Sequence, residues 1–91
     1  MSDLFVPFNF QPLSVSVKSS SYTIPAGNYA LVTVVVEHDG GAASFTIDTV
    51  SAIQVMTAGN IATASFWLPS GTVINGSGDW VATVQLYTNI T

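Results

Sequence analysis

Residues 29–37 read YALVTVVVE and carry the strongest strand signal in the sequence. Most of these side chains are β-branched or aromatic, and such side chains fit the pleated surface of a sheet. In an extended chain the even-numbered residues share one face and the odd-numbered residues share the other. Because apolar side chains fall on both faces, we predict a central strand that is covered on both sides.

The segments around this strand show the alternation of apolar and polar residues that is typical of half-buried strands. Leu13, Val15 and Val17 alternate with polar residues, and residues 80–86 repeat the pattern. Turns separate such segments at spacings of roughly ten residues, as in antiparallel sandwiches and barrels. We therefore predict an all-β fold for residues 13–91, a single domain built as an antiparallel β-sandwich or barrel of jelly-roll type with seven or eight short strands. The turns are expected at residues 25–28, 38–41, 58–60, 69–71 and 75–78.

The scarcity of charge excludes several classes of function. Charged residues make up 7% of the 91 residues, whereas a soluble domain averages about 25%. With a single basic residue, Lys18, the chain lacks the clustered cations that neutralise phosphates, so we predict no nucleic-acid partner and no membrane partner. The absence of cysteine excludes disulfides, thiolate catalysis and cysteine-containing zinc sites.

The same scarcity raises the question of how the surface is solvated. A compact monomer of 9.5 kDa exposes about 5,000 Å², and this chain has five acidic residues and one basic residue to place on it. Two interpretations follow: a monomer coated by serine and threonine, or a subunit whose apolar surface is covered by other subunits. We expect the second, a homo-oligomer, because the strands lack the lysines that protect exposed sheet edges.

The first twelve residues, MSDLFVPFNFQP, differ from the rest of the chain. Two prolines break a run of large apolar residues, and proline at this density favours extended, non-helical backbone. The segment is then either a first strand that covers one end of the core or an apolar arm that binds a partner. For the arm, we predict that the partner-binding residues are Leu4, Phe5, Phe8 and Phe10.

Three short motifs resemble parts of catalytic or metal sites, but each is incomplete. Residues 37–39, Glu-His-Asp, are the one cluster of ionisable side chains, and no second histidine could complete a metal site. Residues 48–49, Asp-Thr, are followed by valine rather than by the glycine of aspartic proteases. Asn75, Ser77 and Asp79 have the oxygen spacing of half a calcium loop but lack its bidentate glutamate. We therefore predict no enzymatic activity, no catalytic residue, no cofactor and no metal.

Five aromatic residues offer a different kind of site. Aromatic rings on one exposed face could bind sugar rings, whereas the same residues more commonly fill a core or an interface. The residues are Tyr22, Tyr29, Trp67, Trp80 and Tyr87.

An apolar strand with a Pro-Ser-Gly-Thr turn, FWLPSGTVI at residues 66–74, is followed by the glycine-rich GSGDW at residues 76–80 and by the strand end VQLY at residues 84–87. With these segments, the second half of the chain resembles small β-rich structural proteins of tailed bacteriophages. The segment from Tyr22 to Val36 fits the same pattern. The resemblance implies a virion protein that assembles as a homotrimer. Because residues 1–12 show neither the basic region nor the apolar run of a signal peptide, we expect it to be made in the host cytoplasm and not secreted.

Three functions are compatible with this resemblance and with the composition. The first is a capsid decoration or cement protein that stabilises the head by binding the major capsid protein or another virion protein. The second is a tail-fibre or receptor-binding tip. The third is a free-standing carbohydrate-binding adhesion module. We expect the first, because fibre tips are usually the ends of longer chains.

Overall fold

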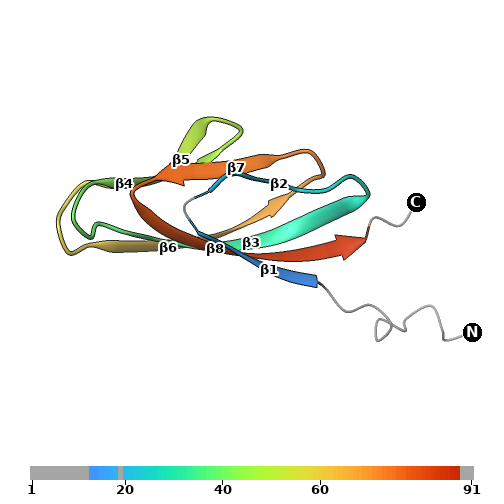
Figure 1. Ribbon diagram of the computed structural model, residues 1–91, viewed down its shortest axis with the longest axis horizontal. Coiled ribbons are helices and arrows are strands. Elements are labelled where there is room, and N and C mark those ends of the chain that lie inside the picture. The colour runs from blue at the N-terminus through green and yellow to red at the C-terminus, as the bar shows by residue number, and fades with distance from the viewer. Residues whose placement is uncertain (1–12, 19, 89–91) are drawn as a thin grey trace, which may run out of the picture.

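The computed structural model describes residues 13–18 and 20–88, and this part of the chain is an all-β sandwich without a helix (Figure 1). The strong alternation found in the sequence accounts for most of its strands, which confirms the predicted fold class. The eight strands of the described residues are β1 (Leu13–Lys18), β2 (Tyr22–Thr23), β3 (Asn28–Glu37), β4 (Ala43–Ile47), β5 (Val50–Val55), β6 (Ile61–Leu68), β7 (Val73–Ser77) and β8 (Asp79–Thr88).

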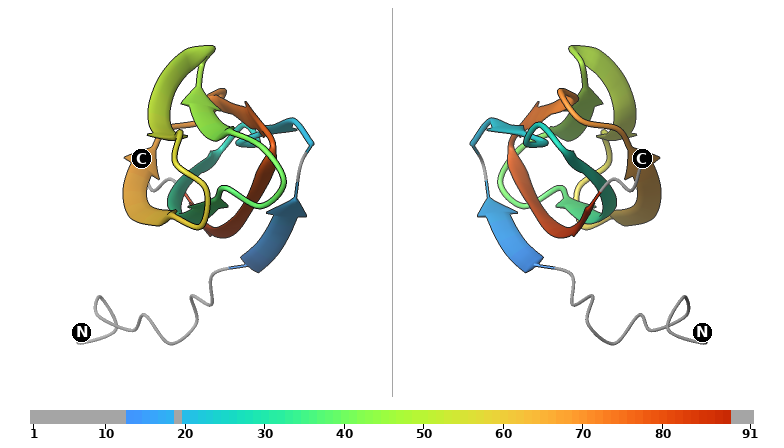
Figure 2. Two further views of the ribbon diagram at one scale, coloured as in Figure 1. Left: turned by 90° about the vertical axis from the view of Figure 1, so that its left-hand side faces the viewer. Right: turned by 90° about the vertical axis from the view of Figure 1, so that its right-hand side faces the viewer.

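The strands form two four-stranded antiparallel sheets that pack face to face. The first sheet has the order β1-β8-β3-β6, and the second has the order β2-β7-β4-β5. Viewed along the long axis, β1 and β2 lie on one flank of the sandwich, and β5 and β6 lie on the other (Figure 2). Strand β8, which follows the other seven in sequence, therefore lies inside the first sheet, between β1 and β3.

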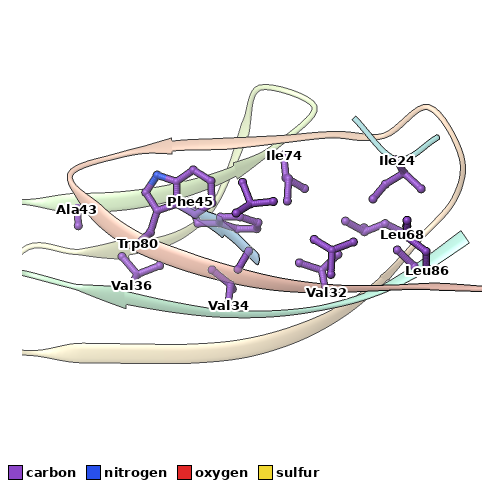
Figure 3. Close-up of a cluster of buried hydrophobic side chains, with 14 of the residues drawn as sticks. Ile24, Val32, Val34, Val36, Ala43, Phe45, Leu68, Ile74, Trp80 and Leu86 are labelled. Atoms are coloured by element: carbon purple, nitrogen blue, oxygen red, sulfur yellow. The ribbon is translucent and has the colours of Figure 1, made fainter. Parts of the chain in front are cut away.

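The core lies between the sheets and is built from the residues that alternation places on their inner faces. Phe45 from β4 and Trp80 from β8 are its two largest fully buried side chains, and they meet edge to face with ring centroids 5.4 Å apart (Figure 3). The other buried apolar residues are Val17, Ile24, Ala30, Val32, Val34, Val36, Ala43, Val55, Leu68, Ile74, Ala82, Val84 and Leu86.

Strand β3 is central, as predicted, but the described chain covers it on one face only. Its even-numbered residues from Ala30 to Val36 are fully buried. On the opposite face Leu31 is half-buried, Thr33 is exposed and Val35 is 40% exposed. The expectation of cover on both sides is wrong for these residues, because the second sheet packs on the inner face and no described element packs on the outer one.

Two similar turns join the sheets at one end of the sandwich. Residues 24–27, Ile-Pro-Ala-Gly, and residues 68–71, Leu-Pro-Ser-Gly, each begin with a buried aliphatic residue and end with a glycine at positive φ. The turns lie side by side, because the Gly71 amide donates to the Ile24 carbonyl over 2.9 Å and the Ile24 amide donates to the Thr72 carbonyl over 2.9 Å. Backbone hydrogen bonds thus tie the two turns directly together.

A single residue, Gly78, connects β7 in the second sheet to β8 in the first sheet. The sequence predicts a loop at residues 75–78, but β7 runs through Ser77 and only Gly78 separates it from β8. Gly76 lies within the strand opposite Phe45, where a Cβ atom would come within 2.3 Å of the Ser44 carbonyl oxygen. Glycine at this position therefore permits close approach of a neighbouring strand rather than a turn.

The hairpin between β4 and β5 contains strained backbone. Asp48 and Thr49 both have positive φ, 50° and 68°, although neither is glycine. Both central residues of a type I′ hairpin turn require positive φ, and a β-branched residue there is disfavoured. Asp48 tolerates positive φ better than Thr49 does, and its Oδ1 atom accepts a hydrogen bond from the Val73 amide over 2.8 Å.

Replacing Thr49 by glycine is expected to stabilise the protein by about 0.5–1 kcal/mol, since glycine adopts positive φ without steric cost. Urea unfolding followed by tryptophan fluorescence measures the change. The Ser51→Gly variant is the control: Ser51 is an exposed strand residue, so glycine there should destabilise by a similar amount. A Thr49→Gly variant no more stable than the parent would contradict strain at this turn.

Candidate functional site

Three aromatic side chains meet on the outer face of the first sheet. The ring centroids of Tyr29, Trp67 and Tyr87 are 5.4 Å apart for the two tyrosines, 6.0 Å for Tyr29 and Trp67, and 5.7 Å for Trp67 and Tyr87. The two tyrosine rings are stacked, and the indole ring is tilted against both. We call these three residues the aromatic cluster.

The order of the strands brings the cluster together. Tyr29 in β3 pairs with Tyr87 in β8, and Leu31 pairs with Trp67 in β6, so the three rings come from three adjacent strands. All three lie at odd-numbered positions, which face away from the core in these strands. They occupy the end of the sheet where β3 begins and where β6 and β8 finish (Figure 1).

Trp67 is the member of the cluster that is most open to solvent. Its side chain is 61% exposed, whereas Tyr29 and Tyr87 are half-buried. An exposed tryptophan supported by two tyrosines presents an apolar aromatic surface to solvent. Aromatic residues in such places supply large contact area together with a polar group at one end of the ring.

Neutral polar groups surround the aromatic cluster. Thr33 and Ser65 lie next to it on the same face, with their hydroxyl oxygens 3.5 Å apart, and Gln85 is half-buried beside Leu31. The side-chain amide of Asn28 donates to the Tyr87 carbonyl over 3.1 Å and so fixes the start of β3 against β8.

No charged residue of the described chain lies at this end of the outer face. The acidic residues of this face, Glu37 and Asp79, are paired at the opposite end of β3 and β8. Glu37 is eight residues along β3 from Tyr29, about 26 Å in an extended strand. Lys18 in β1 lies opposite Val81, nearer to the acidic end than to the cluster. The outer face thus has a neutral aromatic end and a charged end.

The two other aromatic residues named as candidates lie elsewhere. Trp80 is 1% exposed and packs in the core against Phe45, and its Nε1 atom is buried without a hydrogen-bond partner among the described residues. Tyr22 belongs to β2 of the second sheet and packs partly against the core. A shared face for all five aromatic residues is therefore wrong, because two of them lie on other surfaces of the sheets.

A second exposed apolar region lies on the flank formed by β5 and β6. Val50, Met56 and Ile61 are 68%, 69% and 59% exposed. Met56 and Ile61 lie at an open groove that is lined by residues 54–57 and 59–62. The segment from residue 50 to residue 62 contains no charged side chain, but Glu37 of β3 pairs with Ile61, and the backbone of His38 is hydrogen-bonded to Gly59 and Asn60 beside the groove. We call this region the β5–β6 flank.

The ionisable residues considered as metal or catalytic groups are not gathered into a site. Within residues 13–18 and 20–88, no three histidine, aspartate or glutamate side chains are placed to hold a metal ion together. His38 is half-buried after the end of β3, and its Nδ1 atom has no hydrogen-bond partner in the described part. Asp48 is used in the β4–β5 hairpin.

The three residues with the oxygen spacing of half a calcium loop are also separated by the fold. Asn75 and Ser77 belong to β7, and the Ser77 hydroxyl lies 3.0 Å from that of Ser44 in β4. Asp79 lies beyond the Gly78 corner, in the other sheet. The arm residues Leu4, Phe5, Phe8 and Phe10 lie outside the described residues. In the described part, no helix is long and apolar enough to cross a membrane.

Comparisons with protein-family models, with curated proteins and with solved structures found no match. The features of the described residues that bear on function are therefore two exposed apolar regions, the aromatic cluster and the β5–β6 flank.

Proposed function

We propose that this protein is a non-enzymatic structural protein that acts by surface contact, specifically a decoration or cement protein on the head of a tailed bacteriophage. In this role it assembles with itself, as a trimer, and binds the major capsid protein or another virion protein. Leu4, Phe5, Phe8 and Phe10 supply the apolar arm that binds this partner. The number three and the virion location come from the resemblance to phage modules.

The observation that carries this proposal is the exposed apolar groove of the β5–β6 flank. Met56 and Ile61 are exposed at this groove, and large exposed apolar side chains mark contact sites between proteins. The formal net charge of the chain is −4, so two copies repel each other at most orientations. Burial of Met56 and Ile61 at a contact offsets this repulsion, and the occupant of this flank is then a second copy of the chain.

We expect the double variant M56S/I61S to dissociate into monomers. Burying each apolar side chain at a contact is worth about 1.5–3 kcal/mol, so the dissociation constant should rise by about 100-fold or more. Light scattering coupled to gel filtration measures the mass of the species. The control is Trp67→Ser, which also removes an exposed apolar side chain but lies at the other end of β6. A parent protein that runs as a stable monomer refutes the self-assembly, and a parent dimer refutes only the number three.

The virion location is tested separately by quantitative mass spectrometry of purified particles. High copy number in the head supports the decoration role, whereas a few copies at the end of the tail indicate a receptor-binding tip. Absence from the particle overturns the proposal.

A further inference from the structure

We propose that the aromatic cluster of Tyr29, Trp67 and Tyr87 is a binding site for neutral carbohydrate. This site is separate from the β5–β6 flank, since Trp67 lies six residues along β6 from Ile61, about 20 Å in an extended strand. The inference starts from the 61% exposure of Trp67 and from the contact of its ring with both tyrosine rings.

The chemistry of the cluster fits a sugar ring. A pyranose has a face of C–H groups that packs on an aromatic ring and a rim of hydroxyl groups that need hydrogen-bond partners. The indole of Trp67 supplies the apolar surface. The hydroxyl groups of Thr33 and Ser65 and the amide of Gln85 can donate and accept at its edge. This combination of one apolar surface and a few polar groups is what orients small ligands in their sites.

The cluster is also built to stay in place. Its three side chains project from three hydrogen-bonded strands, and the two tyrosines stack directly across the β3–β8 pair. Asn28 holds the same strands together through its hydrogen bond to the Tyr87 carbonyl. A surface that is rigid before binding loses little conformational entropy when the ligand arrives.

The absence of charge at this end of the sheet selects the class of carbohydrate. Acidic sugars and phosphorylated sugars are recognised by arginine or lysine, and the one lysine of the chain, Lys18, pairs far from Trp67 across the sheet. Glu37 and Asp79 lie at the opposite end of the outer face and add to the negative charge of the protein. A neutral oligosaccharide is therefore the ligand, and an anionic one is disfavoured.

Tryptophan fluorescence gives a direct readout of this site. The chain has two tryptophans, and Trp80 is 1% exposed in the core while Trp67 is 61% exposed. A ligand that covers the aromatic cluster should shift the emission of Trp67 and protect it from acrylamide quenching. The experiment titrates the full chain with cellohexaose, maltohexaose, mannohexaose and chitohexaose, and with a galacturonic acid hexamer as the anionic comparison.

We expect at least one neutral hexasaccharide to shift and protect the fluorescence, and the anionic hexamer to do neither. Isothermal titration of Trp67→Ala should show affinity reduced about ten-fold or more, as expected for loss of an aromatic stacking surface. Val35→Ala is the matched control, because Val35 is exposed on the same face farther along β3 and should leave the affinity unchanged.

Three outcomes overturn the proposal. The first is that no neutral hexasaccharide binds at millimolar concentration. The second is that binding is unchanged in Trp67→Ala. The third is that Trp67→Ala alone converts an oligomer into monomers, which would make the cluster a subunit contact. Binding by the M56S/I61S variant at parental affinity would support the site even if the proposed self-assembly failed.

Discussion

Replacing Phe45 by alanine is expected to lower the free energy of unfolding by about 3–5 kcal/mol, the range for large aromatic residues in protein cores. Phe45 is fully buried between the rings of Trp80 and Phe66, at centroid distances of 5.4 and 6.1 Å. Alanine would lose both contacts and leave a cavity where the two sheets meet. Small domains are stable by about 5–15 kcal/mol, so this loss removes a large part of the total.

Urea unfolding of Phe45→Ala and of Trp67→Ala side by side measures this effect. Both variants remove an aromatic side chain, but Trp67 is largely exposed, so its removal should cost less than about 1 kcal/mol. If both variants lost the same free energy of unfolding, Phe45 would not belong to a core between the two sheets, and the structure would be contradicted.

Replacing Gly78 by alanine is expected to destabilise the protein by about 2–5 kcal/mol. Two costs add at this residue. The φ of +78° is strained for any residue with a Cβ, at about 1–2 kcal/mol. The new Cβ would also come within 2.6 Å of the Ala42 carbonyl oxygen and 2.8 Å of the Ala43 Cα and Cβ atoms, and overpacking of this kind costs about 1–3 kcal/mol.

Gly59→Ala separates the two costs. Gly59 has nearly the same φ, +83°, but a Cβ there would have nothing within 4 Å. Its substitution should therefore cost only the conformational part. Thermal unfolding of both variants by circular dichroism gives the comparison, and a Gly78→Ala variant no less stable than Gly59→Ala would show that the close approach at the corner is not maintained.

The alternation of the sequence predicts the strands well because each strand has one buried face. Residues 15–17, 43–47 and 80–86 place most of their apolar side chains on the inner face, as the period of two requires. The sequence pattern was misleading at residues 75–78, Asn-Gly-Ser-Gly, which predict a loop although β7 extends through Ser77. Glycine serves there for the close approach of β4 and for a corner, and neither role depends on neighbours in the sequence.

The candidate site was only partly predictable for a related reason. Tyr29, Trp67 and Tyr87 have odd residue numbers, and Trp80 has an even one. Since side chains alternate between the two faces of a strand, this difference separates the three outward-facing rings from the buried ring of Trp80. That β8 lies beside β3 is a property of the sheet order, and no local pattern encodes it. The meeting of the three rings therefore emerges only when the strands are assembled.

The position of β8 also determines when the protein can fold during its synthesis. The ribosome makes β8 after the other seven described strands, yet β8 is the strand that joins β1 to β3. Until Asp79–Thr88 has left the exit tunnel, β1 has no partner in its sheet and one edge of β3 remains open. Unpaired edges of this kind invite association with other nascent chains. We therefore expect nascent chains arrested before β8 to require chaperones, and the emergence of β8 to trigger folding of the first sheet.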